Sequence, residues 1–179
     1  FLTLFALPRW IKKCHEVGFL WEDMNKFRRL KNVAASGGVI VILAFCLGLL
    51  SYIAIRTFII QLDGESLSIF SLLSVILILA LVGFVDDVLG WTHKGLSIKF
   101  RLFLAFSASI PLVVINAGTQ TIFLPYFGNL NIGILYPLFF IPIGIAGATT
   151  TFNFLAGFNG LEAGQGIIIL SYLSFIAYI

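Results

Sequence analysis

Long stretches without charged residues run through this chain and restrict what it can fold into. Residues 37–60 contain one charged residue, Arg56, and residues 67–85 contain none. A helix of about 20 apolar residues is long enough to cross the hydrocarbon core of a bilayer. The sequence therefore predicts an all-α fold, a polytopic bundle of transmembrane helices. The predicted spans are residues 37–60, 67–85, 102–117 and 134–152, with partial spans at 1–8 and 166–179.

The composition also favours a membrane protein. Hydrophobic residues make up 60% of the 179 residues and charged residues only 11%, whereas about 25% charged residues is usual in soluble domains. Such a chain cannot cover its apolar surface with polar groups, so lipid must cover it. The chain opens on Phe1 and stops within an apolar run. We therefore expect a single transmembrane domain that is an internal piece of a longer protein.

Two other classes of protein do not fit. The net charge of +3 is small, and no aromatic or RNA-binding signature accompanies the basic residues, which argues against nucleic acid as a partner. Cys14 and Cys46 show neither the spacing of metal ligands nor a disulfide framework.

The basic residues are distributed unevenly between the loops. By parity, loops 9–35, 86–101 and 153–165 lie on one side of the membrane, and the first two hold ten of the eleven Lys and Arg residues. Cytosolic loops are enriched in Lys and Arg, so these three loops are expected to face the cytosol. On the other side, the β-branched, aromatic, Pro and Gly residues of 118–133 predict a small extracytoplasmic β-hairpin.

The predicted spans carry almost no ionisable side chains. Apart from Arg56, near the end of its span, none contains Asp, Glu, Lys, Arg or His. Proton-coupled transporters and ion pumps place such groups at mid-membrane depth. The pattern disfavours a transporter and places any chemistry at the cytosolic ends of the spans.

Two adjacent carboxylates, Asp86 and Asp87, follow the second full span in the string GFVDDVLG. The carboxyl end of a helix is the negative end of its dipole, which disfavours acidic residues there. The pair is either a polar stop at the membrane boundary or a catalytic group. In the catalytic interpretation, one carboxylate accepts a proton while the other orients a metal or a phosphate.

A second polar cluster, NFLAGFNGLEAGQG, occupies residues 153–166. Its Asn side chains supply oxygen ligands and amide donors, and its glycines allow the backbone to approach a ligand closely. A Gly-rich membrane loop is the alternative, but the polar side chains favour a site for a diphosphate or a hard metal ion.

Basic residues on the same side supply candidate phosphate ligands. Lys94, Lys99 and Arg101 follow the aspartates closely and are candidates for neutralising phosphate. The alternative is that these residues only anchor a positively charged cytosolic loop. The first loop could likewise bind a nucleotide or be only a positively charged cytosolic loop. The candidates in that loop are Asp23, Asn25 and Lys26.

These segments together resemble the polyprenyl-phosphate N-acetylhexosamine-1-phosphate transferase superfamily. NFLAGFNGLEAGQG is most similar to its eukaryotic and archaeal branch, the dolichyl-phosphate N-acetylglucosamine phosphotransferases, and GFVDDVLG is similar to that branch's aspartate motif. LSIKFR resembles the segment after the aspartates in bacterial relatives that load undecaprenyl phosphate. DMNK, followed later by SGG, resembles the family's first cytosolic loop. The resemblance extends in unbroken order from about residue 17 to the end of the chain.

The resemblance implies a fold of about ten spans, of which this chain would hold the N-terminal half. It implies transfer of N-acetylglucosamine-1-phosphate from UDP-GlcNAc to dolichyl (polyprenyl) phosphate with release of UMP, the first step of lipid-linked oligosaccharide synthesis for N-glycosylation. Mg²⁺ is the expected cofactor, and the UDP-sugar and the lipid phosphate are the expected partners. The enzyme would be a multi-pass protein of the archaeal cell membrane or the endoplasmic reticulum, with its active site on the cytosolic face.

The resemblance also implies roles for particular residues. Asp86 and Asp87 match the aspartate motif near the acceptor phosphate, and Asn153 matches the metal-ligating asparagine. The phosphate-binding lysine matches Lys99, with Arg101 and Lys94 as rivals. The nucleotide-sugar loop matches Asn159, Gly160, Leu161, Glu162, Gly164 and Gln165.

The chain departs from the family pattern at Gly90, where relatives carry Asp or Asn. The family's second metal ligand, an aspartate, and its basic sugar-recognition loop would lie beyond Ile179. The chain alone is therefore expected to lack part of its active site and to be inactive.

Other interpretations stay open at this level. One is a bacterial-type undecaprenyl-phosphate sugar-1-phosphate transferase, which the string NGLEAGQ disfavours. Others are a membrane transporter of sugar conjugates and a non-catalytic half that needs a partner chain. The sequence leaves undecided the exact sugar and lipid, a one-step or phosphoryl-enzyme mechanism, and whether the protein forms a homodimer.

The charge asymmetry predicts the accessibility of single cysteines in the full-length protein. Lys94→Cys and Gly164→Cys are expected to react only with reagents admitted to the cytosol, because they lie on the Lys- and Arg-rich side, and Asn129→Cys only from outside. The measurement is maleimide labelling of sealed and permeabilised cells, in a background that lacks Cys14 and Cys46. Labelling of Lys94→Cys in sealed cells would reverse the orientation.

Overall fold

The helices of this chain form an elongated membrane bundle. The computed structural model describes residues 1–22, 31–61, 64, 66–92, 95–124, 126, 128–154 and 160–178. Helices make up most of this part of the chain, and the sheets are small, which confirms the predicted all-α transmembrane fold. The α-helices are α1 (Leu2–Val17), α2 (Gly38–Ile55), α3 (Ser66–Thr92), α4 (Ile98–Ala108), α5 (Ile110–Ile115), α6 (Ile141–Phe154) and α7 (Leu161–Tyr178).

Short π-helical segments complete two of the spans. The segment η1 (Arg56–Ile60) extends α2, and η2 (Tyr136–Phe140) leads into α6. Five helical stretches of the described residues are long and apolar enough to cross a membrane, so the chain is a multi-pass membrane protein. They are Gly38–Ile60, Ser66–Thr92, Ile98–Ile115, Tyr136–Phe154 and Leu161–Tyr178.

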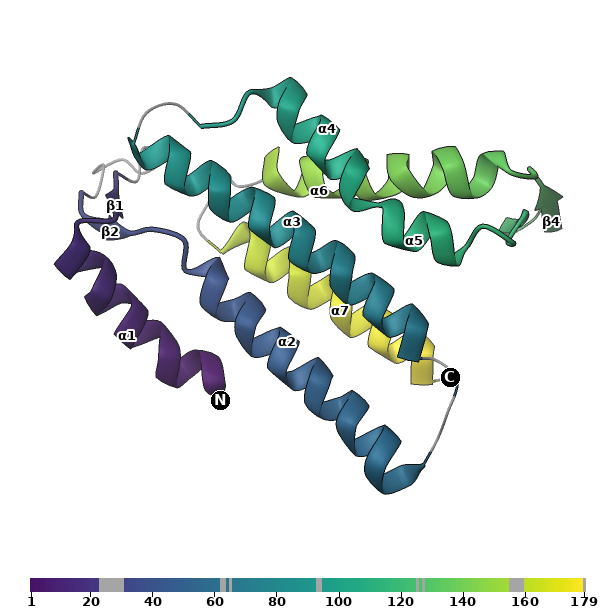
Figure 1. Ribbon diagram of the computed structural model, residues 1–179, viewed down its shortest axis with the longest axis horizontal. Coiled ribbons are helices and arrows are strands. Elements are labelled where there is room, and N and C mark those ends of the chain that lie inside the picture. The colour runs from purple at the N-terminus through teal and green to yellow at the C-terminus, as the bar shows by residue number, and fades with distance from the viewer. Residues whose placement is uncertain are drawn as a thin grey trace.

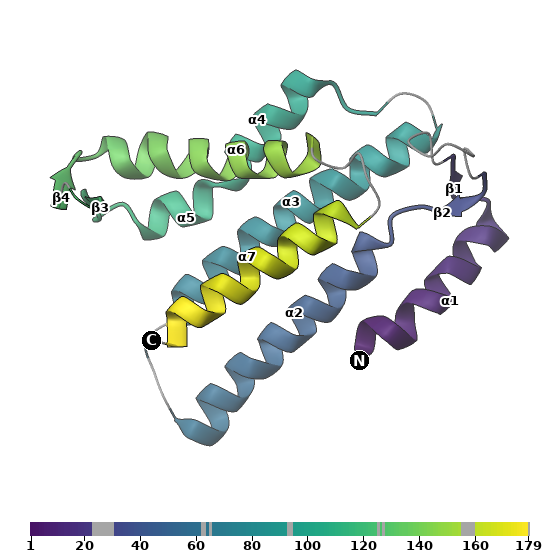
Figure 2. The ribbon, with the colours of Figure 1, turned by 180° about the vertical axis from the view of Figure 1, so that it is seen from behind.

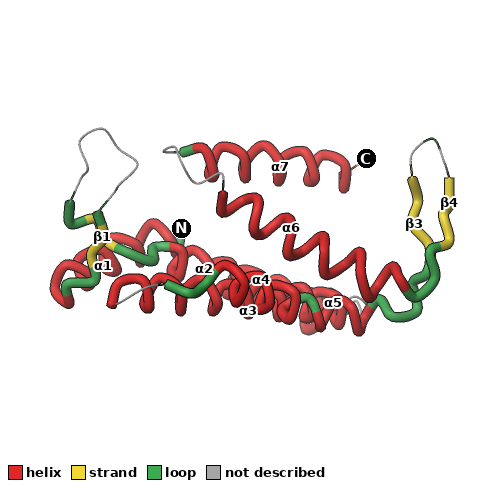
Figure 3. The backbone as a smooth tube through the Cα atoms, turned by 90° about the horizontal axis from the view of Figure 1, so that it is seen from above, coloured by secondary structure: helices red, strands yellow, loops and turns green. Residues whose placement is uncertain are grey.

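The helices are arranged in two layers. In Figure 1, α1, α2 and α3 form a row, and α4 and α5 continue it on the other side of α3. Figure 2 shows the same row from behind, with α7 in front of it. In Figure 3, α7 forms a layer of its own, and α6 slopes from it toward the layer of α1–α5.

Each end of the bundle carries one two-stranded antiparallel sheet. Strands β3 (Thr121–Leu124) and β4 (Gly128–Asn131) pair with Thr121 opposite Asn131, which confirms the predicted hairpin. Strands β1 (Leu20–Trp21) and β2 (Val33–Ala34) pair at the opposite end (Figure 1). The sequence did not predict this second sheet, because two residues per strand are too few to show an alternating pattern.

A small apolar cluster fixes β1 and β2 to the helices. Cys14, Phe19 and Ala35 are its buried members, and the rings of Phe19 and Trp91 meet edge to face with centroids 5.2 Å apart. Burial raises the pKa of the Cys14 thiol above its ordinary value of 9.0. The thiol therefore keeps its proton at neutral pH and donates to the carbonyl of Ala35 at 3.7 Å.

The helix α3 is longer than its predicted span. The span was expected to end at Val85, yet the helix continues to Thr92, so Asp86 and Asp87 lie in its last turns and not in a loop. At 1.5 Å per residue, its 27 residues measure about 40 Å, against a hydrocarbon core of about 30 Å. A helix of this length can keep its apolar part in lipid and carry two carboxylates at the membrane surface.

Small side chains bring the helices around α3 close together. Ala105 and Ala108 of α4 are buried, as is Ala146 of α6. Small residues at helix contacts let the backbones approach closely inside a membrane. The close contacts of α4 with α3 and α6 place three helix ends around the aspartates.

Candidate active site

The two aspartates of α3 face different neighbours. Consecutive residues on an α-helix project about 100° apart, so Asp86 and Asp87 point in different directions. Asp86 meets the segment that joins α3 to α4, and Asp87 meets the segment that precedes α2. The end of the bundle that carries both is called the aspartate end.

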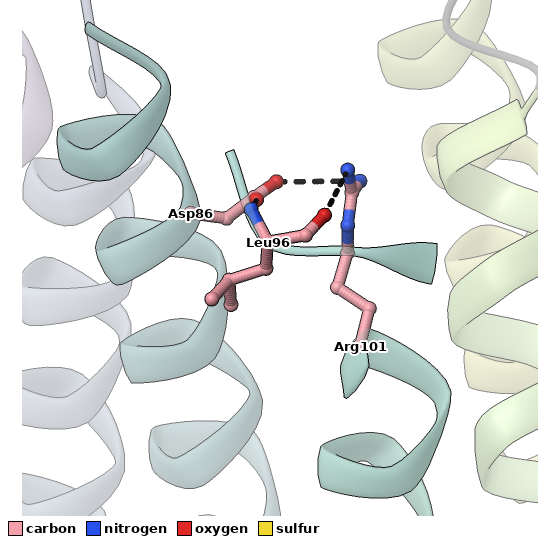
Figure 4. Close-up of polar contacts among 3 residues, drawn as sticks. All are labelled: Asp86, Leu96 and Arg101. Carbon is pink, nitrogen blue, oxygen red and sulfur yellow. Dashed lines mark hydrogen bonds and ion pairs between the residues drawn. The ribbon is translucent and has the colours of Figure 1, made fainter. Parts of the chain in front are cut away.

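Both carboxylate oxygens of Asp86 have partners. The backbone N–H of Leu96 donates to Oδ1 at 2.6 Å, and the guanidinium of Arg101 lies 3.2 Å from Oδ2. Arg101 also donates to the carbonyl of Leu96 at 3.3 Å, which closes the group of three residues shown in Figure 4. The side chain of Asp86 is only 19% exposed, so these donors replace much of the water that a carboxylate needs.

Glycine at position 95 permits this arrangement. A Cβ atom built on Gly95 would lie 2.8 Å from Asp86 Oδ1, closer than such atoms approach in proteins. The absence of a side chain at position 95 lets the backbone of residues 95–96 approach the carboxylate, and a Cβ there would force a shift of the Asp86 carboxylate or of the backbone.

Among the described residues, one donor, Ser36, holds Asp87. The hydroxyl of Ser36 donates to Asp87 Oδ2 at 2.6 Å. In the part of the chain that the structure describes, Asp87 has no second hydrogen bond or ion pair. Asp87 is thus the less engaged of the two carboxylates.

A cavity of about 240 Å³ opens beside the aspartates between α3, α4 and α6, and it is called the aspartate cavity. Asp86, Asp87 and Arg101 line it, and Asn153 faces them from the last turn of α6. The sequence predicted these four residues as site residues, and the structure brings them together. The other lining residues are Leu79, Val82, Gly83, Ile98, Leu102, Ala105, Thr149, Thr150 and Phe154.

The cavity suits a charged ligand at the edge of an apolar region. Arg101 is 38% exposed, and its Nε is buried without a hydrogen-bond partner among the described residues. A guanidinium with donors left over is the preferred partner for phosphate oxygens. The threonine hydroxyls and the Asn153 amide add neutral polar groups opposite the charged residues.

The structure separates the three candidate basic residues. Arg101 lies in the aspartate cavity, whereas Lys99, in the first turn of α4, is exposed and does not line it. Lys94 lies outside the described residues. The geometry therefore favours Arg101 as the cation beside the aspartates.

The predicted nucleotide-sugar residues lie at the start of α7. Gly160, with φ of 78°, precedes the helix, and Glu162 is exposed in its first turn. Gln165 has a buried Oε1 that lacks a partner within the described part of the chain. Of the described residues, Gly160, Leu161, Glu162, Gly164 and Gln165 do not line the aspartate cavity. Asn159 and the first-loop candidates Asp23, Asn25 and Lys26 lie outside the described residues.

Sequence reasoning missed three polar side chains at the site. Thr149 and Thr150 stand four and three residues before Asn153, the spacing that places side chains on one face of a helix. That spacing is visible in the sequence and would have identified them. Ser36 opens the quoted string SGG, but its contact with Asp87 could not be found in this way, because it joins residues 51 positions apart.

The oxygen donors of the cavity fit Mg²⁺. In phosphoryl-transfer sites this ion is held by one or two carboxylates together with substrate phosphates and water. Asp87 and Asn153 offer such oxygens on two sides of the cavity, whereas both oxygens of Asp86 are engaged. The described residues contain no cluster of three or more His, Cys, Asp and Glu side chains. A bound ion would therefore depend on phosphate and water oxygens as well.

Comparison with known proteins identifies related sequences. The model of glycosyl transferase family 4 matches residues 69–179, a stretch that includes both aspartates and Asn153. A relative from Dictyostelium discoideum, named UDP-N-acetylglucosamine–dolichyl-phosphate N-acetylglucosaminephosphotransferase, is 35% identical over 108 residues, which are 54% of this chain and 25% of the relative.

Two further relatives match almost the whole chain. A Sulfolobus acidocaldarius protein that is provisionally given the same name is 31% identical over 175 residues, 98% of this chain and 51% of the relative. A phospho-N-acetylmuramoyl-pentapeptide-transferase from Streptococcus agalactiae is 29% identical over 188 aligned positions, 99% of this chain and 54% of the relative. The chain thus spans about half the length of these two relatives.

The contact at Gly95 predicts the effect of adding one methyl group. Gly95→Ala is expected to lower the melting temperature of the full-length protein, because Asp86 must move away from the Leu96 N–H. Losing a hydrogen bond to a charged group costs about 1.5–3 kcal/mol. The measurement is thermal unfolding in detergent, with Gly48→Ala as the matched control, since a Cβ on Gly48 meets open space. Equal melting temperatures for the two variants would contradict the contact.

Proposed function

The chain belongs to glycosyl transferase family 4, and on that premise we propose that the full-length protein transfers N-acetylglucosamine-1-phosphate from UDP-GlcNAc to dolichyl or a related polyprenyl phosphate. The observation that carries the proposal is the aspartate cavity, where Asp87, Arg101 and Asn153 meet at the end of a membrane-spanning helix. The named relatives support the same activity.

The location of the cavity suits these substrates. A polyprenyl phosphate keeps its chain in the bilayer, so its phosphate can react only at the membrane surface, and a nucleotide sugar reaches that surface from the water. The length of α3 allows the aspartates to lie at this boundary. We assign this side to the cytosol because of the Lys- and Arg-rich loops.

The proposed reaction is a displacement at phosphorus. An oxygen of the lipid phosphate forms a bond to the sugar-bearing phosphorus of UDP-GlcNAc, and the bond from that phosphorus to the bridging oxygen of UMP breaks. Asp87 takes the proton that the lipid phosphate carries, and Arg101 binds phosphate oxygens. Asp86 holds the guanidinium of Arg101 in place through its ion pair. Positioning and charge neutralisation account for most of the catalysis in reactions of this type.

We propose Mg²⁺ as the cofactor, held by the side-chain oxygen of Asn153 together with phosphate and water oxygens. The ion would neutralise charge on the diphosphate and polarise the phosphorus under attack. The donor set of the aspartate cavity supports this assignment. Lys99, Glu162 and Gln165 stay candidates for substrate contacts outside the cavity, together with Lys94, Asn159 and the first-loop residues.

One observation favours a second candidate function. The Streptococcus agalactiae relative is named a phospho-N-acetylmuramoyl-pentapeptide-transferase and aligns with 99% of this chain. A bacterial-type sugar-1-phosphate transferase that uses undecaprenyl phosphate would have the same cavity chemistry. The two candidates differ in sugar donor and lipid acceptor, so an assay with both acceptors separates them.

The proposed function predicts activity that depends on Asp87. Purified full-length protein with UDP-GlcNAc, dolichyl phosphate and Mg²⁺ is expected to release UMP and form a lipid-linked sugar. Asp87→Asn should lower turnover by roughly 10²-fold or more, because a positioned base contributes about that much. Glu16→Gln, the same change at an exposed carboxylate of α1, is the control. Lack of turnover by the wild type, or wild-type turnover in Asp87→Asn, would refute the proposal.

The cofactor assignment predicts a specific defect in Asn153→Ala. Loss of one hard-oxygen ligand should raise the Mg²⁺ concentration required for half-maximal UMP release, and excess Mg²⁺ should restore part of the activity. Asn129→Ala, which removes an exposed amide from β4, should titrate like the wild type. Superimposable Mg²⁺ curves for wild type and Asn153→Ala would remove Asn153 from the metal site.

A further inference from the structure

We propose that Ser36 is a positioning residue, which holds one oxygen of Asp87 against the start of α2 and leaves the other oxygen for the aspartate cavity. This inference rests on the proposed function, in which Asp87 takes the proton of the acceptor phosphate. Ser36 itself does not line the aspartate cavity, and in this proposal it does not contact the substrates.

The contact between the two side chains is short and spans two separate segments. The Ser36 hydroxyl donates to Asp87 Oδ2 at 2.6 Å. A hydrogen bond to a charged acceptor at this distance belongs to the strong class. Ser36 and Asp87 also line a second, largely apolar cavity of about 410 Å³ between α2 and α3, on the other side of Asp87 from the aspartate cavity. Asp87 therefore lines both cavities, and the residue that donates to it, Ser36, lies on the side of the apolar cavity.

The backbone of Ser36 adopts a conformation that disfavours a side chain. Its φ is +52°, in the left-handed region that glycine and asparagine populate most easily. The next two residues, Gly37 and Gly38, are glycines, yet the residue with the positive φ is a serine. A serine at the strained position is consistent with a use for its hydroxyl, since residues held in rare conformations cluster at functional sites.

The preceding residue, Ala35, fixes the position of the Ser36 hydroxyl. The Ala35 carbonyl accepts hydrogen bonds from Trp10 Nε1 at 3.0 Å and from the Cys14 thiol. The Ala35 N–H donates to the Phe19 carbonyl at 3.2 Å. Ser36 thus follows a residue that is hydrogen-bonded both to α1 and to Phe19, the residue before β1, and its hydroxyl meets Asp87 at a defined point.

Two variants separate the hydroxyl from the backbone. Ser36→Gly removes the hydroxyl and its hydrogen bond to Asp87 but relieves the positive φ, so the two effects on the melting temperature oppose each other. Asn32→Gly is the matched control, because Asn32 has a φ of +65° in the same segment and its exposed side chain has no contact with Asp87. Any effect of backbone strain alone should appear in both variants.

The kinetic measurement is kcat and KM of the full-length enzyme with UDP-GlcNAc and dolichyl phosphate. Ser36→Gly is expected to lower kcat by about 10-fold or more with an unchanged KM for UDP-GlcNAc, because a misplaced catalytic group costs rate and not nucleotide binding. Asn32→Gly should match the wild type. A wild-type kcat in Ser36→Gly, or an equal loss in Asn32→Gly, would overturn the proposal.

A second measurement does not depend on turnover. The rate at which a carbodiimide labels Asp87, followed by mass spectrometry of the peptide, should rise in Ser36→Gly, since the carboxylate loses its donor. The rate should not change in Asn32→Gly. Unchanged labelling in Ser36→Gly would overturn the positioning role. Faster labelling in a protein that transfers no sugar phosphate would retain that role and refute the proposed function alone.

Discussion

Two adjacent carboxylates at the carboxyl end of a long apolar helix carry an electrostatic cost, and the aspartate end is organised by the groups that offset it. The helix dipole is negative at this end, and partial burial weakens the hydration of both charges. Asp86 receives a backbone N–H and a guanidinium from the segment that follows α3, and Asp87 receives a hydroxyl from the segment that precedes α2. The groups that compensate the two charges therefore hold two separate segments, one before α2 and one after α3, against the end of α3.

Under the proposed function, these different partners give the two carboxylates different roles. Asp86 has partners at both oxygens and orients Arg101, whereas Asp87 keeps an oxygen for chemistry. Transfer of a phosphoryl group needs placed charges more than covalent steps, and placed charges need a rigid support. The small buried side chains of α4 and α6 supply that support, because they let α4 pack closely against both α3 and α6.

The sequence predicts what depends on local pattern. Apolar runs predict the spans, Pro and Gly predict the hairpin of β3 and β4, and residue type identifies Asp86, Asp87, Arg101 and Asn153 as site candidates. Contacts between distant segments leave no such pattern, so Ser36 and the sheet of β1 and β2 were missed. The predicted span ended at Val85 because the charged pair was taken as the end of the helix. In the structure the helix continues to Thr92, and donors from distant segments stabilise the aspartates within it.

The central claim is that Asp87 and Asn153, from two helices, act on one reacting phosphate. A double-mutant cycle on kcat/KM for UMP release tests it most directly, with Asp87→Asn, Asn153→Ala and the double variant of the full-length protein. Groups that work as a unit are strongly non-additive. The account predicts that the double variant is little slower than the slower single variant. A loss equal to the product of the two single losses would show independent actions and contradict a shared site.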